Sequence, residues 1–274
     1  MSYKDEGIIT VQKCTNDDEW EKLRYCFEKS FENYPLHTYY MPEISKRADF
    51  LKRYLNACHS ATKKKEGIVM AIQKNTEIIG GFIFDPIPSS ESSFVLDSER
   101  FTEAYLENNI DHHYPESFSR IKRYERWEDQ TILELFRKRS LKLQWEGMFC
   151  AIDPSYRGGG IGSILTNTNP FANENISVTS GTNCISETSN AAELLLKADG
   201  QIIDINGIRE EKDPRRKLVP ILIICHDRQS VGFMLKNRCQ LIAEKTYKDD
   251  IETSVLQFPV YFFKGEIIVE NYKL

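Results

Sequence analysis

Apolar residues near the start of the chain first follow a strand pattern and then a helical one. The run from Gly7 to Cys14 predicts a strand. A helix is expected after Asn16, with Glu19 three positions later in the arrangement of a capping box. Its apolar residues recur at helical spacing: Trp20, Leu23, Phe27 and Phe31.

A second helix and a hairpin are predicted next. The helix follows Pro42, and its apolar stripe is Ile44, Ala48, Leu51, Leu55 and Cys58. Residues 68–73 and 78–84 are two apolar runs separated by a polar turn, which indicates a β-hairpin. Residues 89–143 then change to polar and aromatic helical patterns, so we interpret them as an insertion that folds over the main sheet.

The second half of the chain alternates between strands and irregular segments. A strand is expected over Trp145–Ile152. Residues 166–190 are rich in Asn, Ser and Thr, which favour turns, and we expect 166–217 to be the most mobile segment near the site. Within it, "AAELLLKAD" suggests a short helix. An apolar strand precedes His226, "RQSVGFMLKN" is helical, and two strands end the chain, with Pro259 marking an edge or a bulge.

Strands that pair as hairpins, alternating with helices, predict an α/β (α+β) fold. The expected architecture is a mixed, mostly antiparallel sheet flanked by helices. The chain of 274 residues is interpreted as one domain with insertions near 89–143 and 166–217.

Composition narrows the function and the compartment. The net charge of −5 argues against a nucleic-acid partner and permits a small cationic one. Seven cysteines without a C-x-x-C pair suit buried thiols in a reducing compartment. There is no apolar signal core and no run near the ~18 apolar residues of a membrane span, so a cytoplasmic or nuclear protein is expected.

The stretch "DPSYRGGGIG", residues 153–162, lies between a predicted strand and the apolar start of a helix. Successive backbone N–H groups at such a turn, together with an arginine, form an anion site. The P-loop lysine is missing, and the dinucleotide fingerprint lacks its third glycine. The pattern R-x-x-G-x-G matches at Arg157, Gly160 and Gly162.

This pattern resembles the pyrophosphate loop of the GNAT acyltransferases, which bind acetyl-coenzyme A. The order of predicted elements and the last helix and strand are also similar. The resemblance implies that acetyl-CoA is the co-substrate. It implies that the pyrophosphate is held by Arg157, Gly158, Gly159, Gly160, Ile161, Gly162 and Ser163. It further implies that the main chain of Cys150, Ala151 and Ile152 pairs with the pantetheine arm, and that the strand 221–225 splays away to leave a slot for the thioester.

Glu146 is the candidate general base, because acetyl transfer requires an unprotonated amine. By strand alternation, residues 146, 148, 150 and 152 share one face. Burial in an apolar strand is expected to raise the pKa of this carboxylate. A similar strand, E-x-x-F-C-A, carries the catalytic glutamate in the histone-acetylating GNAT branch. The competing interpretation is a glutamate at the solvent-facing start of the strand.

The general acid is not evident from the sequence. Family members often have a tyrosine in the last helix, where this chain has Met234, or Leu196 in a rival alignment. Water, His226 or Tyr247 are the alternatives, or the thiolate leaves unprotonated. Asp227 and Ser230 are weaker candidates for contacts to the pantetheine or thioester.

Three other features could have either a chemical or a purely structural role. Cys150 is interpreted as a buried thiol rather than a nucleophile, and Asp111-His112-His113 as a polar loop rather than a metal site. An aromatic set either holds an amine through cation–π contacts or only packs: Tyr34, His37, Tyr39 and Tyr40.

The leading hypothesis is therefore an acetyl-CoA-dependent N-acetyltransferase of a small-molecule amine that needs no metal and no membrane. Acetylation of a protein lysine or N-terminus is the alternative enzyme. A catalytically silent acetyl-CoA sensor is the third hypothesis. The oligomeric state stays open, with a homodimer among the options.

Overall fold

A computed structural model describes residues 8–88, 91–139, 143–157, 176–179, 195–198, 201–204, 216–237, 239–249, 251 and 257–270. In these ranges the strands are β1 (Ile8–Lys13), β2 (Ile68–Lys74), β3 (Glu77–Pro86), β4 (Trp145–Ile152), β5 (Ile176–Thr179), β6 (Leu195–Ala198), β7 (Gln201–Asp204), β8 (Arg216–Cys225), β9 (Gln240–Lys248) and β10 (Gln257–Glu270). The helices are α1 (Asp17–Phe31), α2 (Pro35–Tyr40), α3 (Ile44–Lys64), α4 (Glu91–Glu107), α5 (Ile110–His113), α6 (Pro115–Arg139) and α9 (Arg228–Lys236), with a 3₁₀ turn at Pro154–Tyr156.

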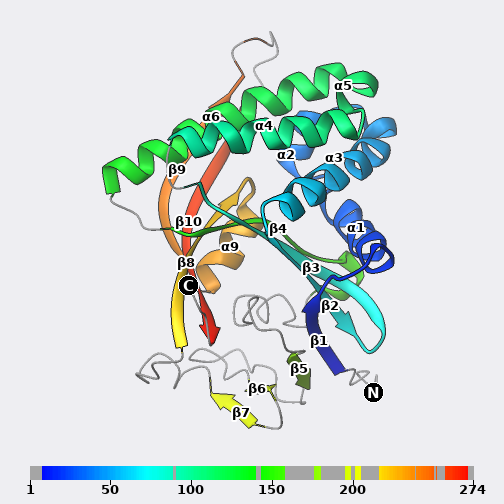
Figure 1. The fold of residues 1–274 in the computed structure, drawn as a ribbon, viewed down its shortest axis with the longest axis vertical. Helices are drawn as coiled ribbons and strands as arrows, with labels where there is room; N and C mark the ends of the chain where they lie inside the picture. The colour runs from blue at the N-terminus through cyan, green and yellow to red at the C-terminus, as the bar shows by residue number, and fades with distance from the viewer. Residues whose placement is uncertain are drawn as a thin grey trace.

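These strands form one sheet in the order β7-β6-β5-β1-β2-β3-β4-β8-β10-β9. Every neighbouring pair is antiparallel except β4 and β8, which are parallel. Helices flank the sheet (Figure 1). The predicted fold class, a mixed and mostly antiparallel sheet with helices, is confirmed.

The start of α1 follows its sequence signals closely. The side chain of Asn16 accepts a hydrogen bond from the Glu19 amide at 3.0 Å. The Glu19 carboxylate accepts from the Thr15 amide at 2.7 Å, one residue before the donor expected in a capping box. Leu23 and Phe27 are fully buried, and Phe27 packs on Phe149 of β4. The first helix is therefore fixed on the sheet as its periodicity predicted.

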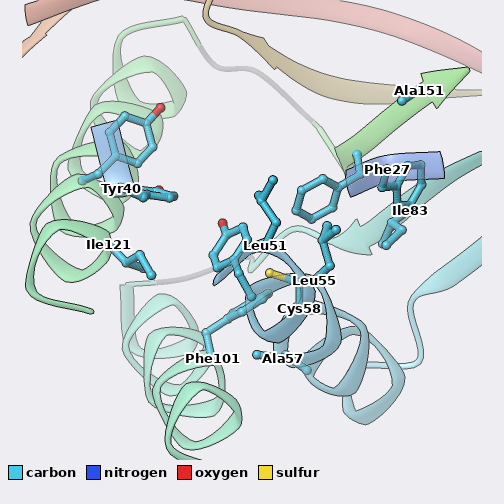
Figure 2. Close-up of a cluster of buried hydrophobic side chains, with 14 of the residues drawn as sticks. Phe27, Tyr40, Leu51, Leu55, Ala57, Cys58, Ile83, Phe101, Ile121 and Ala151 are labelled. Atoms are coloured by element: carbon cyan, nitrogen blue, oxygen red, sulfur yellow. The ribbon is translucent and has the colours of Figure 1, made fainter. Parts of the chain in front are cut away.

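The buried face of α3 differs from the predicted stripe. Leu51, Leu55 and Cys58 are buried, but Ile44 and Ala48 are exposed. Arg47 takes the inner position in the first turns, where it donates to three carbonyl oxygens at the connections to α3: Glu32, Met41 and Pro42. Figure 2 shows α3 side chains lying between residues from the sheet side and residues of the helical insertion.

The predicted insertion forms the helices α4, α5 and α6, which lie beyond α2 and α3 at one end of the molecule (Figure 1). α6 also contacts the far part of the sheet, because Tyr124 packs on Tyr247 and Phe258, and Trp127 packs on Phe262. His112 and His113 belong to the one-turn helix α5 rather than to a polar loop. The insertion thus spans from α3 to β9 and β10.

The expected helix in "AAELLLKAD" is wrong where the structure describes it. Leu195–Ala198 is β6, which pairs with β7, and β5 joins this hairpin to β1. Pairing with β7 outweighs the helix propensity of the leucines. The sequence between the two strands is Asp199-Gly200, which is a strong hairpin signal. Most of 166–217, and with it the expected mobility of that segment, lies outside the described residues.

Side chains of β8 and β10 alternate between two cores. Leu222 and Phe262 face the main core under the insertion, while Cys225 and Phe263 face a smaller core with Met234 of α9. α9 therefore covers the opposite face of the sheet. At Pro259 β10 pairs with β9 alone, because the pairing with β8 begins at Tyr261. Only one edge of β10 is therefore hydrogen-bonded to a described strand at this proline, as in an edge strand.

Close packing between β2 and β3 leads to a stability prediction. A Cβ at Gly81 would lie 2.1 Å from the carbonyl oxygen of Met70, whereas a Cβ at Gly232 in α9 meets nothing within 4 Å. We expect Gly81→Ala to destabilise the protein by about 1–3 kcal/mol. Gly232→Ala, the matched control, gains about 0.5–1 kcal/mol from helix propensity. Urea denaturation measures both, and equal midpoints would contradict the packing at Gly81.

Candidate active site

β4 and β8 form a fork. The two strands pair only from Trp145 to Gly147 on β4 and from Ile221 to Ile223 on β8. Beyond Gly147, no described strand pairs with this edge of β4, while β8 continues beside β10 to Cys225. The splaying of the two strands, expected from the resemblance, is therefore present.

A β-bulge at the fork changes which residues share a face. Ile83 pairs with Phe149 and Phe84 pairs with Gly147, so Met148 is the additional residue on β4. The alternation shifts by one position at Met148, and the prediction that Glu146 shares a face with Cys150 is wrong. Glu146 lies on the face of Phe149, toward the main core and the insertion.

The bulge places two carboxylates side by side. Asp85 on β3 is the direct cross-strand partner of Glu146, and such pairs have Cβ atoms about 4.5–5.5 Å apart. Asp85 is 1% exposed, so its carboxylate depends on an ion pair rather than on solvent. Lys65 lies against this pair, with its Nζ 3.2 Å from Asp85 and 2.8 Å from Asp97. A buried ammonium thus offsets the repulsion of the two acids.

α6 brings three more acids to the same place: Glu125, Glu128 and Asp129. The pKa of Glu146 is raised to about 8, chiefly by burial, while Lys65 opposes the shift and Asp85 adds to it. Burial also raises the pKa of Asp129 to about 7. The pKa of Glu128 is raised by burial and then by Glu146. We call these four residues, Asp85, Glu128, Asp129 and Glu146, the acidic wall.

The acidic wall does not have the arrangement of a metal site. In the described part of the chain, no group of three or more His, Cys, Asp or Glu side chains is placed to hold a metal ion. The wall instead combines one deeply buried acid, Asp85, with half-buried acids on the helix and strand that face it. Its chemistry suits an ammonium group or the removal of a proton.

The residues proposed to bind acetyl-CoA are described only in part. Cys150 is exposed, which corrects its interpretation as a buried thiol, because it points to the sheet face opposite α1. A Cβ at Gly80 would lie 2.3 Å from the Ala151 carbonyl oxygen, so this oxygen points toward β3. Backbone N–H and C=O groups of successive strand residues point to opposite edges. The backbone N–H and C=O of Cys150 are therefore directed to the open edge of the fork. The Ile152 carbonyl accepts from Ser30 and from Nε of Arg157, both at 3.1 Å.

The remaining cofactor residues have other positions. Gly158, Gly159, Gly160, Ile161, Gly162 and Ser163 lie outside the described residues. Asp227 is the N-cap of α9, and its carboxylate accepts from the amide of Ser230 at 2.6 Å and from its hydroxyl at 3.1 Å. Both side chains thus begin the helix next to the fork, and any contact to the thioester stays a prediction.

The two candidate acids His226 and Tyr247 lie in different hydrogen-bond networks, each with one member of the aromatic set. His226, directly after β8, has hydrogen-bond partners on both ring nitrogens, Tyr34 and Tyr124. Tyr247 lies in another network, with Tyr39 at 2.9 Å. His37, Tyr39 and Tyr40 are buried in the core and pack there, while Tyr34 is half-buried at the fork. Met234 belongs to α9 and is buried in the smaller core.

Sequence reasoning missed Asp85 and Glu128. Asp85 stands at the end of an apolar strand in "GGFIFDP". If β4 had been paired with this strand, the charged residue opposite Glu146 could have been predicted. Glu128 carries no such signal, because "RYERWEDQ" resembles any solvated helix. Its contact with the sheet depends on the docking of the insertion.

Among the comparisons with known proteins, only that with solved structures found similar proteins. No protein-family model matches the chain, and no curated protein matches it. Similar solved structures include an apo mutant of agmatine N-acetyltransferase, with a TM-score of 0.46, 13% identity, and 94% of this chain and 99% of the other covered. The mosquito arylalkylamine N-acetyltransferase-like 5b has a TM-score of 0.44, 13% identity and coverages of 94% and 99%. Drosophila melanogaster polyamine N-acetyltransferase, described as forming N-acetylagmatine, has a TM-score of 0.44, 13% identity and coverages of 93% and 98%.

At 13% identity and TM-scores below 0.5, these likenesses define no substrate for this chain. The chain's own topology has most of the element order expected from the resemblance. Three helices follow the first strand, the two expected ones, α1 and α3, with the short α2 between them. A hairpin, the helical insertion and then a strand that forks from its parallel neighbour before the glycine motif come next. No described helix is long and apolar enough to cross a membrane.

Proposed function

We propose that this protein transfers the acetyl group of acetyl-CoA to the amine of a small cationic molecule. The observation that carries the proposal is the Glu146–Asp85 pair, which lies at the fork directly before the R-x-x-G-x-G motif. The pyrophosphate would be bound by Arg157 and the backbone of residues 158–163. The pantetheine arm would lie along the open edge of β4, beside Cys150, Ala151 and Ile152.

Glu146 is the proposed general base. An ammonium cannot attack a thioester, so a carboxylate must remove its proton, directly or through water. Because Asp85 and Glu146 share one small space, the first proton taken up by the pair relieves the repulsion between them. Burial in the first place, and this repulsion in addition, raises the pKa of Glu146 to about 8, which is the basicity needed near neutral pH.

Met148 supplies a candidate for oxyanion stabilisation. A bulged residue is left outside the regular ladder, and this one lies on the edge of β4 where β8 has separated. Its amide would act on the developing oxyanion of the thioester carbonyl, as backbone donors do in other acyl transfers.

The acidic wall favours a cationic acceptor. The carboxylates of Glu128 and Asp129 on α6 and of Glu146 on β4 interact electrostatically, and an ammonium bound near them would lower their mutual repulsion. The net charge of −5 supports the attraction of a small cation rather than of nucleic acid. We further propose that residues 1–274 act as a single catalytic domain, in the cytoplasm or nucleus, where the six described free cysteines stay reduced.

A panel of amines tests the proposal. The protein is mixed with acetyl-CoA and with polyamines, arylalkylamines, aminoglycosides or histone peptides, and thiol release is measured together with the mass of the product. We expect small cationic amines to be acetylated most efficiently. Acetylation restricted to peptides would favour the protein acetyltransferase. Binding of acetyl-CoA without turnover on any amine would favour the sensor.

A further inference from the structure

A chain of hydrogen bonds connects the fork with the acidic wall. Tyr34 Oη lies 3.1 Å from Nδ1 of His226, and Nε2 of His226 lies 2.6 Å from Tyr124 Oη. The Tyr124 hydroxyl donates to Glu128 at 2.8 Å. These four side chains come from the N-cap of α2, the end of β8 and two positions of α6. Elements far apart in the sequence therefore meet in one continuous polar path.

The two ends of this path lie at chemically different places. Tyr34 is held at the fork, because its oxygen also accepts from the backbone amide of His226 at 2.9 Å. His226 lies three residues beyond Ile223, the last β8 residue that pairs with β4. Glu128, at the other end, is in electrostatic contact with Glu146. The path thus runs from the place proposed for the thioester to the place proposed for proton removal.

The middle of the path is suited to proton transfer rather than to charge storage. His226 is 5% exposed, and burial, together with the neighbouring His37, lowers its pKa to about 3. A neutral imidazole has one N–H and one acceptor nitrogen, so it can take a proton at one nitrogen while it gives up the proton on the other. Tyr124, which is 1% exposed, is likewise donor and acceptor.

We propose that Tyr34 is the general acid of this enzyme and that His226 and Tyr124 supply its proton from Glu128. This inference rests on the proposed acetyl transfer. The attacking amine forms the C–N bond, the C–S bond breaks, and its electron pair leaves with the sulfur. The thiolate takes the Tyr34 proton, Tyr34 takes the Nδ1 proton of His226, and Nε2 takes the Tyr124 proton. Tyr124 then takes a proton from Glu128.

The balance closes over one turnover. An ammonium substrate loses two protons when it becomes an amide. Both amine protons leave through Glu146 to solvent, and the thiolate takes the Tyr34 proton. After the transfer Glu128 is ionised and accepts from Tyr124, as in the structure, and the imidazole proton lies on Nε2. One proton from solvent that enters at Tyr34 and passes through His226 and Tyr124 to Glu128 restores the starting state. No oxidant, metal or further reactant is required.

The test compares three tyrosines that lose the same hydroxyl. Tyr34→Phe and Tyr124→Phe break the path, while Tyr39→Phe removes a buried hydroxyl that bonds Tyr247 and Asp249 instead. With a cationic amine and acetyl-CoA, we expect kcat to fall about 10²-fold in the first two variants. We expect Tyr39→Phe to keep the wild-type kcat although its stability falls.

Solvent deuterium provides a readout that a structural role would not change. In H₂O–D₂O mixtures the wild-type kcat is expected to fall along a curve, because several protons move in one step. Tyr124→Phe is expected to give a straight line, because the coordinated transfer is lost. Acetyl-CoA affinity by calorimetry should be the same in all three variants.

The outcomes separate this inference from the proposed function. Absence of acetylation by the wild type, with acetyl-CoA bound, would overturn the proposed function and the path together. Acetylation by the wild type with equal kcat in Tyr34→Phe and Tyr39→Phe would overturn the path alone. A loss in Tyr34→Phe without one in Tyr124→Phe would also overturn it, since Tyr34 would then act by itself.

Discussion

Gly160→Glu is expected to abolish acetyl-CoA binding, and Gly162→Glu should do the same. The glycine motif predicts that backbone N–H groups approach the pyrophosphate directly. A glutamate side chain would fill this space and place a negative charge against the phosphates. Hydrogen bonds to charged groups contribute about 1.5–3 kcal/mol each. Losing several of them weakens binding by roughly 10³-fold or more.

Two further variants isolate the cause of that loss. Gly160→Ala adds only a methyl group, so it is expected to weaken binding less than the glutamate and to show the steric part alone. Ser45→Glu places the same charge on an exposed position in the first turn of α3 and is expected to leave binding unchanged. Calorimetry with acetyl-CoA measures all four proteins. Wild-type affinity in both glycine-to-glutamate variants would end the acetyl-CoA proposal.

Local sequence patterns were sufficient to predict most of the sheet. The β2–β3 hairpin, the β4 strand, β8 and β9 are apolar runs between polar turns, and each was expected near its observed bounds. The last strand was also expected, but it continues to Glu270, seven residues beyond the predicted end. The capping residue Asn16 located the start of α1 to the residue. The fork was expected from the resemblance, because no local pattern shows where parallel strands separate.

The site depended on features that no local pattern encodes. A bulge at Met148 reverses the alternation on β4, and the strict period of two therefore assigned Glu146 to the wrong face. Asp85 and Lys65 approach Glu146 from separate elements. On α3, the buried Arg47 displaced Ile44 from the inner face, because its guanidinium satisfies carbonyl groups at the ends of the neighbouring helices. Long-range contacts decided each of these cases.

Glu146→Gln is expected to lower kcat by roughly 10²–10⁴-fold while the affinity for acetyl-CoA stays close to that of the wild type. The amide has nearly the shape of the carboxylate but cannot accept a proton. The loss should shrink as the pH rises, because more of the amine is then deprotonated without a base. Initial rates at saturating acetyl-CoA, measured across the pH range, test this expectation.

The pH profile of kcat/KM tests the direction of the pKa shift of Glu146. With its pKa raised to about 8, Glu146 is protonated at lower pH and cannot serve as the base. The wild-type kcat/KM should therefore fall as the pH drops below about 8, far above the ordinary glutamate value of about 4.3. Asp85→Asn removes a neighbouring negative charge, so it should move this limb to lower pH. Glu146→Gln should remove the part of the limb that belongs to Glu146.

Glu43→Gln is the matched control, because Glu43 is exposed at the N-cap of α3, and its kinetics are expected to be unchanged. The competing role for Glu146 is attraction of the cationic amine without proton transfer. In that case Glu146→Gln raises KM and leaves kcat unaltered, since only uniform binding has been removed. A wild-type kcat at saturating amine and neutral pH would exclude Glu146 as the base. The proton would then leave through a water held by backbone groups of the fork.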